Sequence, residues 1–407
     1  MKSKLLLLLC IVATLNFSCS DDENDKIELT AGELSISEGK FGNELIITGE
    51  GFSEIKEENI VTINDLIIPV EEATSSKLVI TIPKEATTGK LSVKVEETSI
   101  DFGTFTVRKE KLFAMKSNYD EGTHHIVLID QETGIEEPFM ELPKLDKDID
   151  IMYSSLCYLP KTREFLIMTR AEWPVRDYSI LRIDIETKAI IKKEFNETDE
   201  LEDIALMSDE ENNVYLSKDF EWSEEEDRKT SIYEFNIETG VQLLLTEVTG
   251  DYIFDCKVNK ATNQLLMVID NDRHSDRETK LVSFDFDTEK LKEIPLTYSK
   301  SLYGFEIALD NDIYVANETV FEERKELMKI NTITGAEEVI TELPNPKESY
   351  GNPTYFETTN ELIYFLTDDN DVTTALLKIN LTNKTTTEID FQASSETYYK
   401  CAFSIFL

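Results

Sequence analysis

Six segments of the sequence share one pattern, in which an alternating strand ends at Asp or Asn and leads into a turn that contains Thr and often Gly. In the first segment the strand 126–129 ends at Asp130, and the turn continues through Thr133 to Gly134. Asp and Asn begin such turns by hydrogen-bonding the backbone that follows, and Gly supplies the left-handed residue that closes a hairpin. The six anchor residues are Asp130, Asp184, Asn236, Asp285, Asn331 and Asn380, at spacings of 54, 52, 49, 46 and 49 residues. An internal repeat of this length constrains the fold more than any other feature of the chain.

Each repeat of roughly 50 residues has room for four short strands. In the second repeat the expected strands are 150–159, 164–169, 179–185 and 189–195. Four strands per repeat are typical of a β-propeller blade. The first repeat begins at Lys111 without an opening strand, and the last repeat leaves the strand 399–407 unused. We therefore predict a six-bladed β-propeller over residues 110–407, closed by the C-terminal strand, which would complete the first blade and remove an exposed sheet edge.

Residues 27–107 precede the repeats and show short alternating strands separated by Gly, Pro and Asn. Three stretches, 47–53, 73–76 and 82–89, together resemble the immunoglobulin-like IPT/TIG domain. The resemblance implies a β-sandwich without catalytic residues, of a kind that serves as a spacer or an interaction unit, and we interpret it as a stalk. The predicted fold class is therefore all-β, with an N-terminal immunoglobulin-like β-sandwich followed by the six-bladed propeller.

The N-terminus has the features of a secretory signal, with two lysines, a short apolar run and a small residue, Ser18, before Cys19. This junction resembles the cleavage site of bacterial lipoproteins, which implies a signal peptide at 1–18 and acylation of Cys19; a plain secretory signal is the alternative. The acidic tether 19–26 resembles the surface-export signal of some Gram-negative lipoproteins. The resemblance implies attachment to the outer membrane, facing the cell exterior. No later segment reaches the roughly 18 apolar residues expected of a membrane-spanning helix.

The chain is strongly acidic, with 82 Asp and Glu against 41 Lys and Arg and a formal net charge of −41. This charge repels phosphate backbones and anionic membranes, so we expect no nucleic-acid partner. It is compatible with a cationic partner, with bound Ca²⁺ or simply with solubility. The acidic stretches 270–272 and 368–371 offer oxygen ligands for calcium but follow no known calcium-loop spacing. We therefore predict no cofactor and leave the metal, calcium included, open.

One face of the predicted propeller collects the longest and most aromatic segments. On that face the loops between the second and third strands of each blade meet the connections between blades, and Trp173 and Trp222 fall at equivalent loops of adjacent repeats. The candidate ligand-binding residues are Trp173, Arg176, Trp222, Tyr252, His274, Tyr303, Tyr350 and Tyr398. Exposed aromatic rings beside Asp, Asn and Arg suit a glycan platform and equally a protein-binding hot spot; the alternative is that these rings pack between blades. We also expect four acidic residues near the starts of innermost strands to converge on the central channel, namely Asp203, Asp251, Asp255 and Glu306.

Catalytic motifs are absent from the sequence. It has only three histidines, His124, His125 and His274, and no nucleophile elbow, HExxH, P-loop or dinucleotide fingerprint. The cysteines outside the leader, Cys157, Cys256 and Cys401, lie in apolar strand patterns without metal-ligand spacing, so we interpret them as structural. We assign no catalytic residues and favour a non-enzymatic protein, while a polysaccharide lyase or glycosidase remains the third hypothesis.

The whole chain resembles accessory lipoproteins that Gram-negative glycan-foraging bacteria place beside outer-membrane importers. This resemblance implies a cell-surface lipoprotein whose propeller binds an extracellular ligand, with a glycan as the leading expectation, as an accessory to outer-membrane uptake. The expected partners are the membrane, through the N-terminal lipid, and a polysaccharide or an outer-membrane protein. The second hypothesis is a structural or scaffolding lipoprotein that binds a protein partner.

Overall fold

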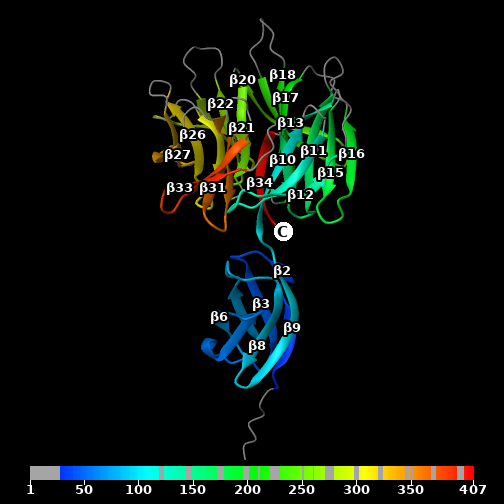
Figure 1. The fold of residues 1–407 in the computed structure, drawn as a ribbon, viewed down its shortest axis with the longest axis vertical. Helices are drawn as coiled ribbons and strands as arrows, with labels where there is room; N and C mark the ends of the chain where they lie inside the picture. Colours follow the sequence, from blue (N-terminus) through cyan, green and yellow to red (C-terminus); the bar gives the residue numbers. More distant parts are fainter. Residues whose placement is uncertain are drawn as a thin grey trace, which may run out of the picture. The chain divides into compact units, whose positions relative to one another are not determined.

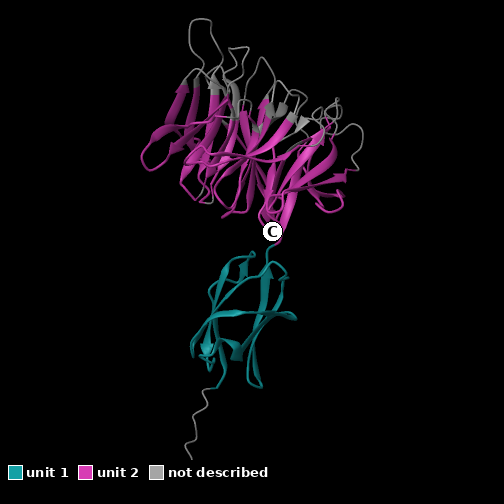
Figure 2. Ribbon diagram, turned by 90° about the vertical axis from the view of Figure 1, so that its left-hand side faces the viewer, with its two compact units in different colours: residues 1–108 teal, residues 109–407 magenta. Residues whose placement is uncertain are grey.

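The chain folds into two compact units, Met1–Arg108 and Lys109–Leu407, in a computed structural model (Figure 2). The structure describes residues 28–118, 123–143, 149–171, 178–195, 201–209, 211–220, 229–249, 252–259, 261–270, 279–297, 302–319, 324–343, 349–350, 352–367, 373–391 and 398–407, with some side chains at strand ends excluded. Within these ranges the regular structure consists of β-strands and one short 3-10 helix, η1 (Lys56–Glu58). The all-β prediction is confirmed.

The first unit is a sandwich of two sheets, with strand orders β1-β3-β7-β6 and β2-β9-β8-β4-β5 (Figure 1). Alternate residues of each strand point into the space between the sheets; in β3, for example, Leu45 and Ile47 are fully buried and face Val61 and Phe105 of the other sheet. The strands are β1 (Thr30–Leu34), β2 (Glu38–Gly39), β3 (Glu44–Glu50), β4 (Asn59–Ile63), β5 (Leu66–Ile68), β6 (Val70–Ala73), β7 (Lys77–Thr81), β8 (Gly89–Val95) and β9 (Thr98–Val107).

The second unit is a six-bladed propeller of antiparallel sheets (Figure 1). Blades 2 to 5 each run from the innermost to the outermost strand in chain order. They contain β13 (Ile149–Leu159), β14 (Glu164–Ala171), β15 (Tyr178–Asp184) and β16 (Ile190–Phe195); β17 (Leu201–Ser208), β18 (Val214–Phe220), β19 (Lys229–Phe235) and β20 (Gln242–Thr249); β21 (Tyr252–Asn259), β22 (Gln264–Asp270), β23 (Thr279–Asp285) and β24 (Lys290–Ile294); and β25 (Leu302–Ile307), β26 (Ile313–Thr319), β27 (Arg324–Ile330) and β28 (Glu337–Glu342). In blade 6 the innermost strand is split; its members are β29 (Ser349–Tyr350), β30 (Thr354–Phe356), β31 (Glu361–Thr367), β32 (Thr373–Asn380) and β33 (Thr385–Asp390).

The C-terminal strand closes the ring. Blade 1 has the order β12-β11-β10-β34, in which β10 (Glu110–Asn118), β11 (Thr123–Ile129) and β12 (Glu136–Glu141) come from the start of the unit and β34 (Tyr398–Phe406) from its end. The end of β34 is clamped by two backbone hydrogen bonds, since Lys109 N–H donates to Leu407 at 2.7 Å and Leu407 N–H donates to Lys109 at 2.9 Å. The predicted closure by the C-terminal strand is confirmed, and β10 has no exposed edge.

The six repeated turns share one geometry. In blade 1 the Asp130 carboxylate accepts the N–H groups of Glu132 and Thr133 at 2.9 and 2.8 Å, and Gly134 closes the turn at a φ of +66°. The other five anchors accept the same pair of backbone bonds, or at least the second of them. Three of the turns place a non-glycine residue at the left-handed position, namely Lys188, Glu289 and Lys384. The anchor side chain therefore determines the turn more strongly than glycine does.

Apolar side chains fill the seams, a term used here for the contacts between neighbouring blades. Between blades 4 and 5, Leu266 and Val268 of β22 pack on Phe305 and Val315 of the next blade, and all four are fully buried. The cross-strand register then tells which side chains of an innermost strand face the following blade, because directly opposed residues point to the same side of a sheet.

Candidate functional site

Ion pairs occupy the end of the propeller at which the described turns lie. In blade 2, Arg182 contacts Glu164 of the same blade at 2.9 Å and Glu238 in the turn of blade 3. At the same position in blade 6, Lys378 contacts Glu361 at 3.3 Å and Glu132 in the turn of blade 1 at 2.5 Å. These pairs join neighbouring blades at this end of the propeller.

The proposed aromatic site belongs to the opposite end, where second strands finish and third strands begin. Trp173, Arg176, Trp222 and His274 lie outside the described residues, as does Cys19. Tyr252, Tyr303, Tyr350 and Tyr398 belong to β21, β25, β29 and β34, and their side chains are likewise outside the description. Their backbone positions show one regularity: all four lie at or next to the start of an innermost strand, in the consecutive blades 4, 5, 6 and 1. The assignment of ligand-binding residues therefore stays a prediction.

One position of the innermost strands distinguishes blades 4 and 5 from the rest. Each turn anchor lies opposite a residue at the start of the second strand, and that residue lies opposite one on the innermost strand. The position is two residues before the latter, and its side chain faces the following blade. The residues there, from blade 1 to blade 6, are Phe403, Cys157, Met207, Lys257, Glu306 and Thr354. Only Lys257 and Glu306 carry a charge, and Lys257 Nζ lies 3.0 Å from Glu306 Oε2.

Asp255 completes this charged group. It precedes Lys257 by two residues in β21 and so faces the same blade. Its carboxylate accepts the N–H of Cys256 at 2.8 Å and the N–H of Phe305, in blade 5, at 3.0 Å. We call Asp255, Lys257 and Glu306 the polar seam. It binds blade 4 to blade 5 beside the propeller axis, but its side chains keep contact with solvent, since those of Lys257 and Glu306 are 26% and 20% exposed.

The electrostatics of the polar seam are perturbed. Burial raises the pKa of Asp255 to about 6, although Lys257 and the N–H of Phe305 favour its ionised form. Burial alone would lower the pKa of Lys257, but the carboxylates of Glu306 and Asp255 raise it above its usual value. In contrast, desolvation raises the pKa of the Cys157 thiol, at the equivalent position of blade 2, to about 12, which favours its protonated form. Perturbed groups with access to solvent are common at functional sites.

The structure brings together two of the four acidic residues expected at the channel. Asp255 and Glu306 both approach Lys257, whereas Asp251 and the side chain of Asp203 lie outside the described residues. Sequence reasoning missed Lys257, because a lysine in an alternating strand usually marks the solvent side. The only available signal was its presence on an innermost strand, where most side chains are enclosed.

An amide extends the polar seam toward blade 6. Gly304, two residues before Glu306, is buried and has a φ of +37°. A Cβ atom there would lie 2.3 Å from Asn352 Oδ1, so only glycine permits the side chain of Asn352 to rest on this backbone. Asn352 itself is exposed. Together the four side chains present carboxylate, ammonium and amide groups along three consecutive blades.

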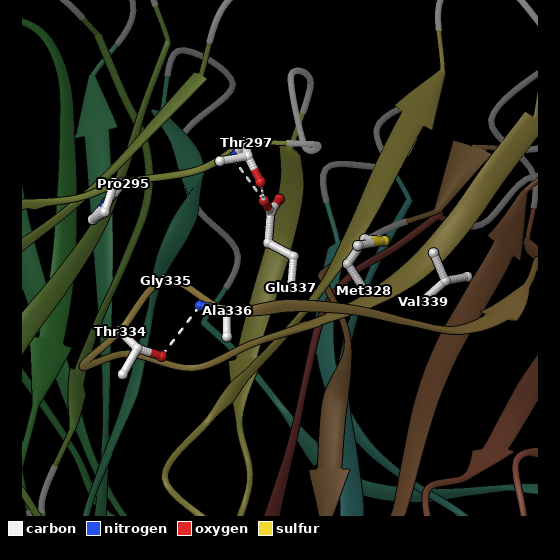
Figure 3. Close-up of a pocket in the computed structure, with 8 residues that line it drawn as sticks. All are labelled: Pro295, Thr297, Met328, Thr334, Gly335, Ala336, Glu337 and Val339. Atoms are coloured by element: carbon white, nitrogen blue, oxygen red, sulfur yellow. Dashed lines mark hydrogen bonds between the residues drawn. The ribbon is translucent and has the colours of Figure 1, made fainter.

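A groove of about 450 Å³ opens between blades 4 and 5, near their outer strands (Figure 3). Its lining residues are Pro295, Thr297, Met328, Thr334, Gly335, Ala336, Glu337 and Val339. The polar groups within it bind one another: Glu337 accepts the N–H and the hydroxyl of Thr297 at 2.7 and 2.9 Å, and Thr334 Oγ1 accepts the N–H of Ala336. These polar groups of the groove are therefore engaged within the fold.

The remaining candidate residues, a histidine and the possible metal ligands, do not form a second site within the described residues. His124 is buried in blade 1, where its Nδ1 lies 2.9 Å from the buried hydroxyl of Ser117. Among the described residues, no group of three or more His, Cys, Asp or Glu side chains is arranged to hold a metal ion. The two acidic stretches considered for calcium fall outside the description, apart from the backbone of Asp270.

Comparison with known proteins supports the two-part architecture. The family model of the IPT/TIG domain matches residues 32–107. A search of curated proteins finds no significant match to the chain. Among solved structures, TolB from Acinetobacter baumannii is 10% identical over 85% of this chain and 82% of its own, with a TM-score of 0.52. A protein of unknown function from Bacteroides thetaiotaomicron is 12% identical over 93% and 92% of the two chains, with a TM-score of 0.47. An auxiliary nutrient binding protein from the same organism is 14% identical over 90% and 86%, with a TM-score of 0.41.

These findings define the class of protein: an all-β chain in which an IPT/TIG domain precedes a six-bladed β-propeller. At such low identities the likeness concerns the fold alone, and TM-scores below 0.5 carry no argument about function. The part of the chain that the structure describes contains no helix with the length and apolar character of a membrane span.

Proposed function

We propose that this chain is a cell-surface lipoprotein whose propeller binds an extracellular glycan and serves as an accessory to uptake across the outer membrane. The observation that carries the proposal is the polar seam itself. It places an ammonium group and a carboxylate, both partly exposed to solvent, beside the axis, at a position that is uncharged in the other four blades.

The polar seam suits sugar hydroxyls. A hydroxyl donates one hydrogen bond and accepts others, so it is matched by a donor and an acceptor side by side, as Lys257 Nζ and Glu306 Oε2 are at 3.0 Å. In the described structure Lys257 donates a single hydrogen bond, to Glu306, and an ammonium group has three donors. The seam carries a net charge of −1 when all three groups are ionised, and the whole chain −41, which disfavours acidic glycans. The expected ligand is therefore a neutral glycan.

Trp173 and Trp222 are the proposed aromatic part of the ligand-binding surface, with Arg176, His274 and the four tyrosines at the starts of the innermost strands, at the end of the propeller opposite the turns. The test uses a chain without residues 1–26, which retains every described residue. Retardation in gels containing neutral or acidic polysaccharides is measured with and without EDTA, and product release is followed in parallel. We expect retardation by a neutral polysaccharide without turnover. Release of products would instead identify an enzyme. If no polysaccharide retards the protein, a protein partner would be favoured.

The double substitution Trp173→Ala and Trp222→Ala separates binding from folding. If the rings contact ligand, retardation is lost while the melting temperature hardly changes. If both properties fall together, the rings belong to the core and the aromatic site is wrong. For the anchor, Cys19→Ser is expected to release the protein from membranes and to abolish incorporation of a labelled fatty acid; incorporation into the variant would refute acylation at Cys19.

A further inference from the structure

The outermost strands of the six blades offer an internal comparison. Each presents an edge with unpaired backbone groups, and native proteins protect such edges with charged residues or proline. Five of the six are protected in this way: β12 contains Pro138, and β16, β24, β28 and β33 each contain two or more charged residues. The sixth, β20 in blade 3, is the longest, with eight residues, and Glu247 is its only charge.

The unprotected edge is also apolar and exposed. Val241, the residue before the strand, is 62% exposed, and Leu243 and Leu244 in its first half are 60% and 48% exposed. A bulge at Leu245, between the pairs Tyr233↔Leu244 and Ile232↔Thr246, divides the strand into two halves. Blades 1 and 5 have a similar irregularity in their outer strands, so the bulge does not explain the difference. The half before the bulge pairs regularly with β19, and no further strand in the described part of the chain covers its outer side.

The charges around this edge indicate the chemistry of its partner. Glu234 lies opposite Leu243 on β19, and Glu247 follows in β20; both are exposed. No lysine or arginine lies in β20. A second copy of the chain would bring another formal charge of −41, which opposes self-association. An extended segment with apolar and basic side chains would instead pair its backbone with the edge, cover the leucines and neutralise the carboxylates.

We infer that residues 241–244 form a docking edge for an extended apolar and basic segment of a partner protein, bound by strand addition. This site is separate from the glycan site proposed above. It would allow the propeller to bind a protein partner through its rim while the axis stays free.

The experiment uses the chain without residues 1–26 and a peptide of alternating valine and lysine as the probe. Binding is measured by fluorescence anisotropy, and strand addition by protection of the amides of 242–244 from hydrogen exchange. A peptide with glutamate in place of lysine controls for charge. Leu243→Lys tests the edge, and Ile191→Lys on β16, which is 59% exposed, is the matched control on another blade.

We expect the lysine peptide to bind and to protect these amides, Leu243→Lys to weaken binding by about tenfold or more, and Ile191→Lys to leave it unchanged. Sedimentation velocity should show a monomer. Equal binding of the glutamate peptide, absence of added protection at 242–244, or equal loss in both variants would overturn the inference. A dimer that disappears in Leu243→Lys would assign the edge to a second copy of the chain and would equally overturn it.

Discussion

Blades 1 and 4 use the same backbone position for opposite chemistry. In blade 1 it holds Phe403, whose ring lies 5.6 Å from that of Phe113 and 5.0 Å from that of Phe165, measured between centroids. Phe113 and Phe165 are fully buried, so the seam between blades 1 and 2 is apolar and aromatic. In blade 4 the position holds Lys257, whose ammonium group meets Glu306 beside solvent.

The aromatic seam between blades 1 and 2 contributes to closing the ring, whereas the polar seam between blades 4 and 5 is the proposed place of recognition. Burying aromatic rings contributes stability in proportion to the area removed from water. Burying charges requires desolvation, and replacing a buried ion pair by apolar residues is often neutral or stabilising. Since four of the six blades close without a charge at this position, closure of the ring does not require the polar seam. The proposed function assigns it to recognition of a polar ligand.

The largest expected effect comes from removing the strand that completes blade 1. Deletion of residues 398–407 removes β34, including Phe403, and leaves the inner edge of β10 without a partner strand. The aromatic seam is then opened to water and the edge is free to pair with other chains. We expect loss of the cooperative thermal transition and aggregation in size-exclusion chromatography. A truncated chain that melts cooperatively near the temperature of the intact chain would contradict the closure mechanism.

The next effect concerns the aromatic seam itself. Phe165→Ala removes a fully buried ring that contacts Phe113, Phe139, Tyr158 and Phe403. We expect the free energy of unfolding to fall by about 3–5 kcal/mol, measured in urea. Phe165→Leu, which preserves part of the volume, serves as the control and should cost clearly less. Equal costs for the two variants would mean that the aromatic contacts add little.

Breaking the polar seam should cost less, because it is partly open to solvent. Lys257→Met leaves the carboxylates of Asp255 and Glu306 without their counter-charge, and we expect a loss of roughly 1–3 kcal/mol in urea unfolding. The double variant Lys257→Met with Glu306→Leu removes the pair together and should lie within about 1 kcal/mol of the wild type. A double variant that is less stable than the single one would show that the pair itself stabilises the ring.

The smallest expected effect is a dependence on pH. The pKa of Asp255 is raised to about 6 by burial, so between its ordinary value and pH 6 the folded chain holds a proton that the unfolded chain has released. Its contribution to the free energy of unfolding is therefore present at low pH and decreases as the pH rises through 6, by about 1 kcal/mol between pH 5 and pH 7. Urea titrations at several pH values should show this decrease in the wild type and its loss in Asp255→Asn. An identical pH profile in the two proteins would mean that Asp255 does not titrate in this range.

The ring was predictable because its signals are local and repeated. Asp130 and its five counterparts make their turn bonds within three residues, so the same short pattern produces the same hairpin wherever it occurs. Blade 1 was the one repeat that lacked a strand, so the extra C-terminal strand could be assigned to it. The left-handed backbone at Lys188, Glu289 and Lys384 was not signalled by glycine, because the anchor side chain holds those turns without it.

The polar seam was only partly predictable. Its partners lie 49 residues apart in the sequence, and the alternation of a strand does not tell whether a lysine faces water or another blade. Asp255 and Glu306 could be assigned to innermost strands from the repeat, but their contact depends on how two blades meet. Gly304 and Asn352 gave no local signal at all, since their contact is a close approach between separate strands.

Binding by the double variant Lys257→Met with Glu306→Leu tests the central claim most directly, namely that the polar seam is kept for recognition. Its affinity for whichever neutral polysaccharide retards the wild type is compared with that of Met207→Leu, a substitution at the equivalent position of blade 3. The account predicts a loss of at least roughly tenfold in the double variant at nearly unchanged stability, and no loss in Met207→Leu. Undiminished affinity in a stable double variant would contradict it.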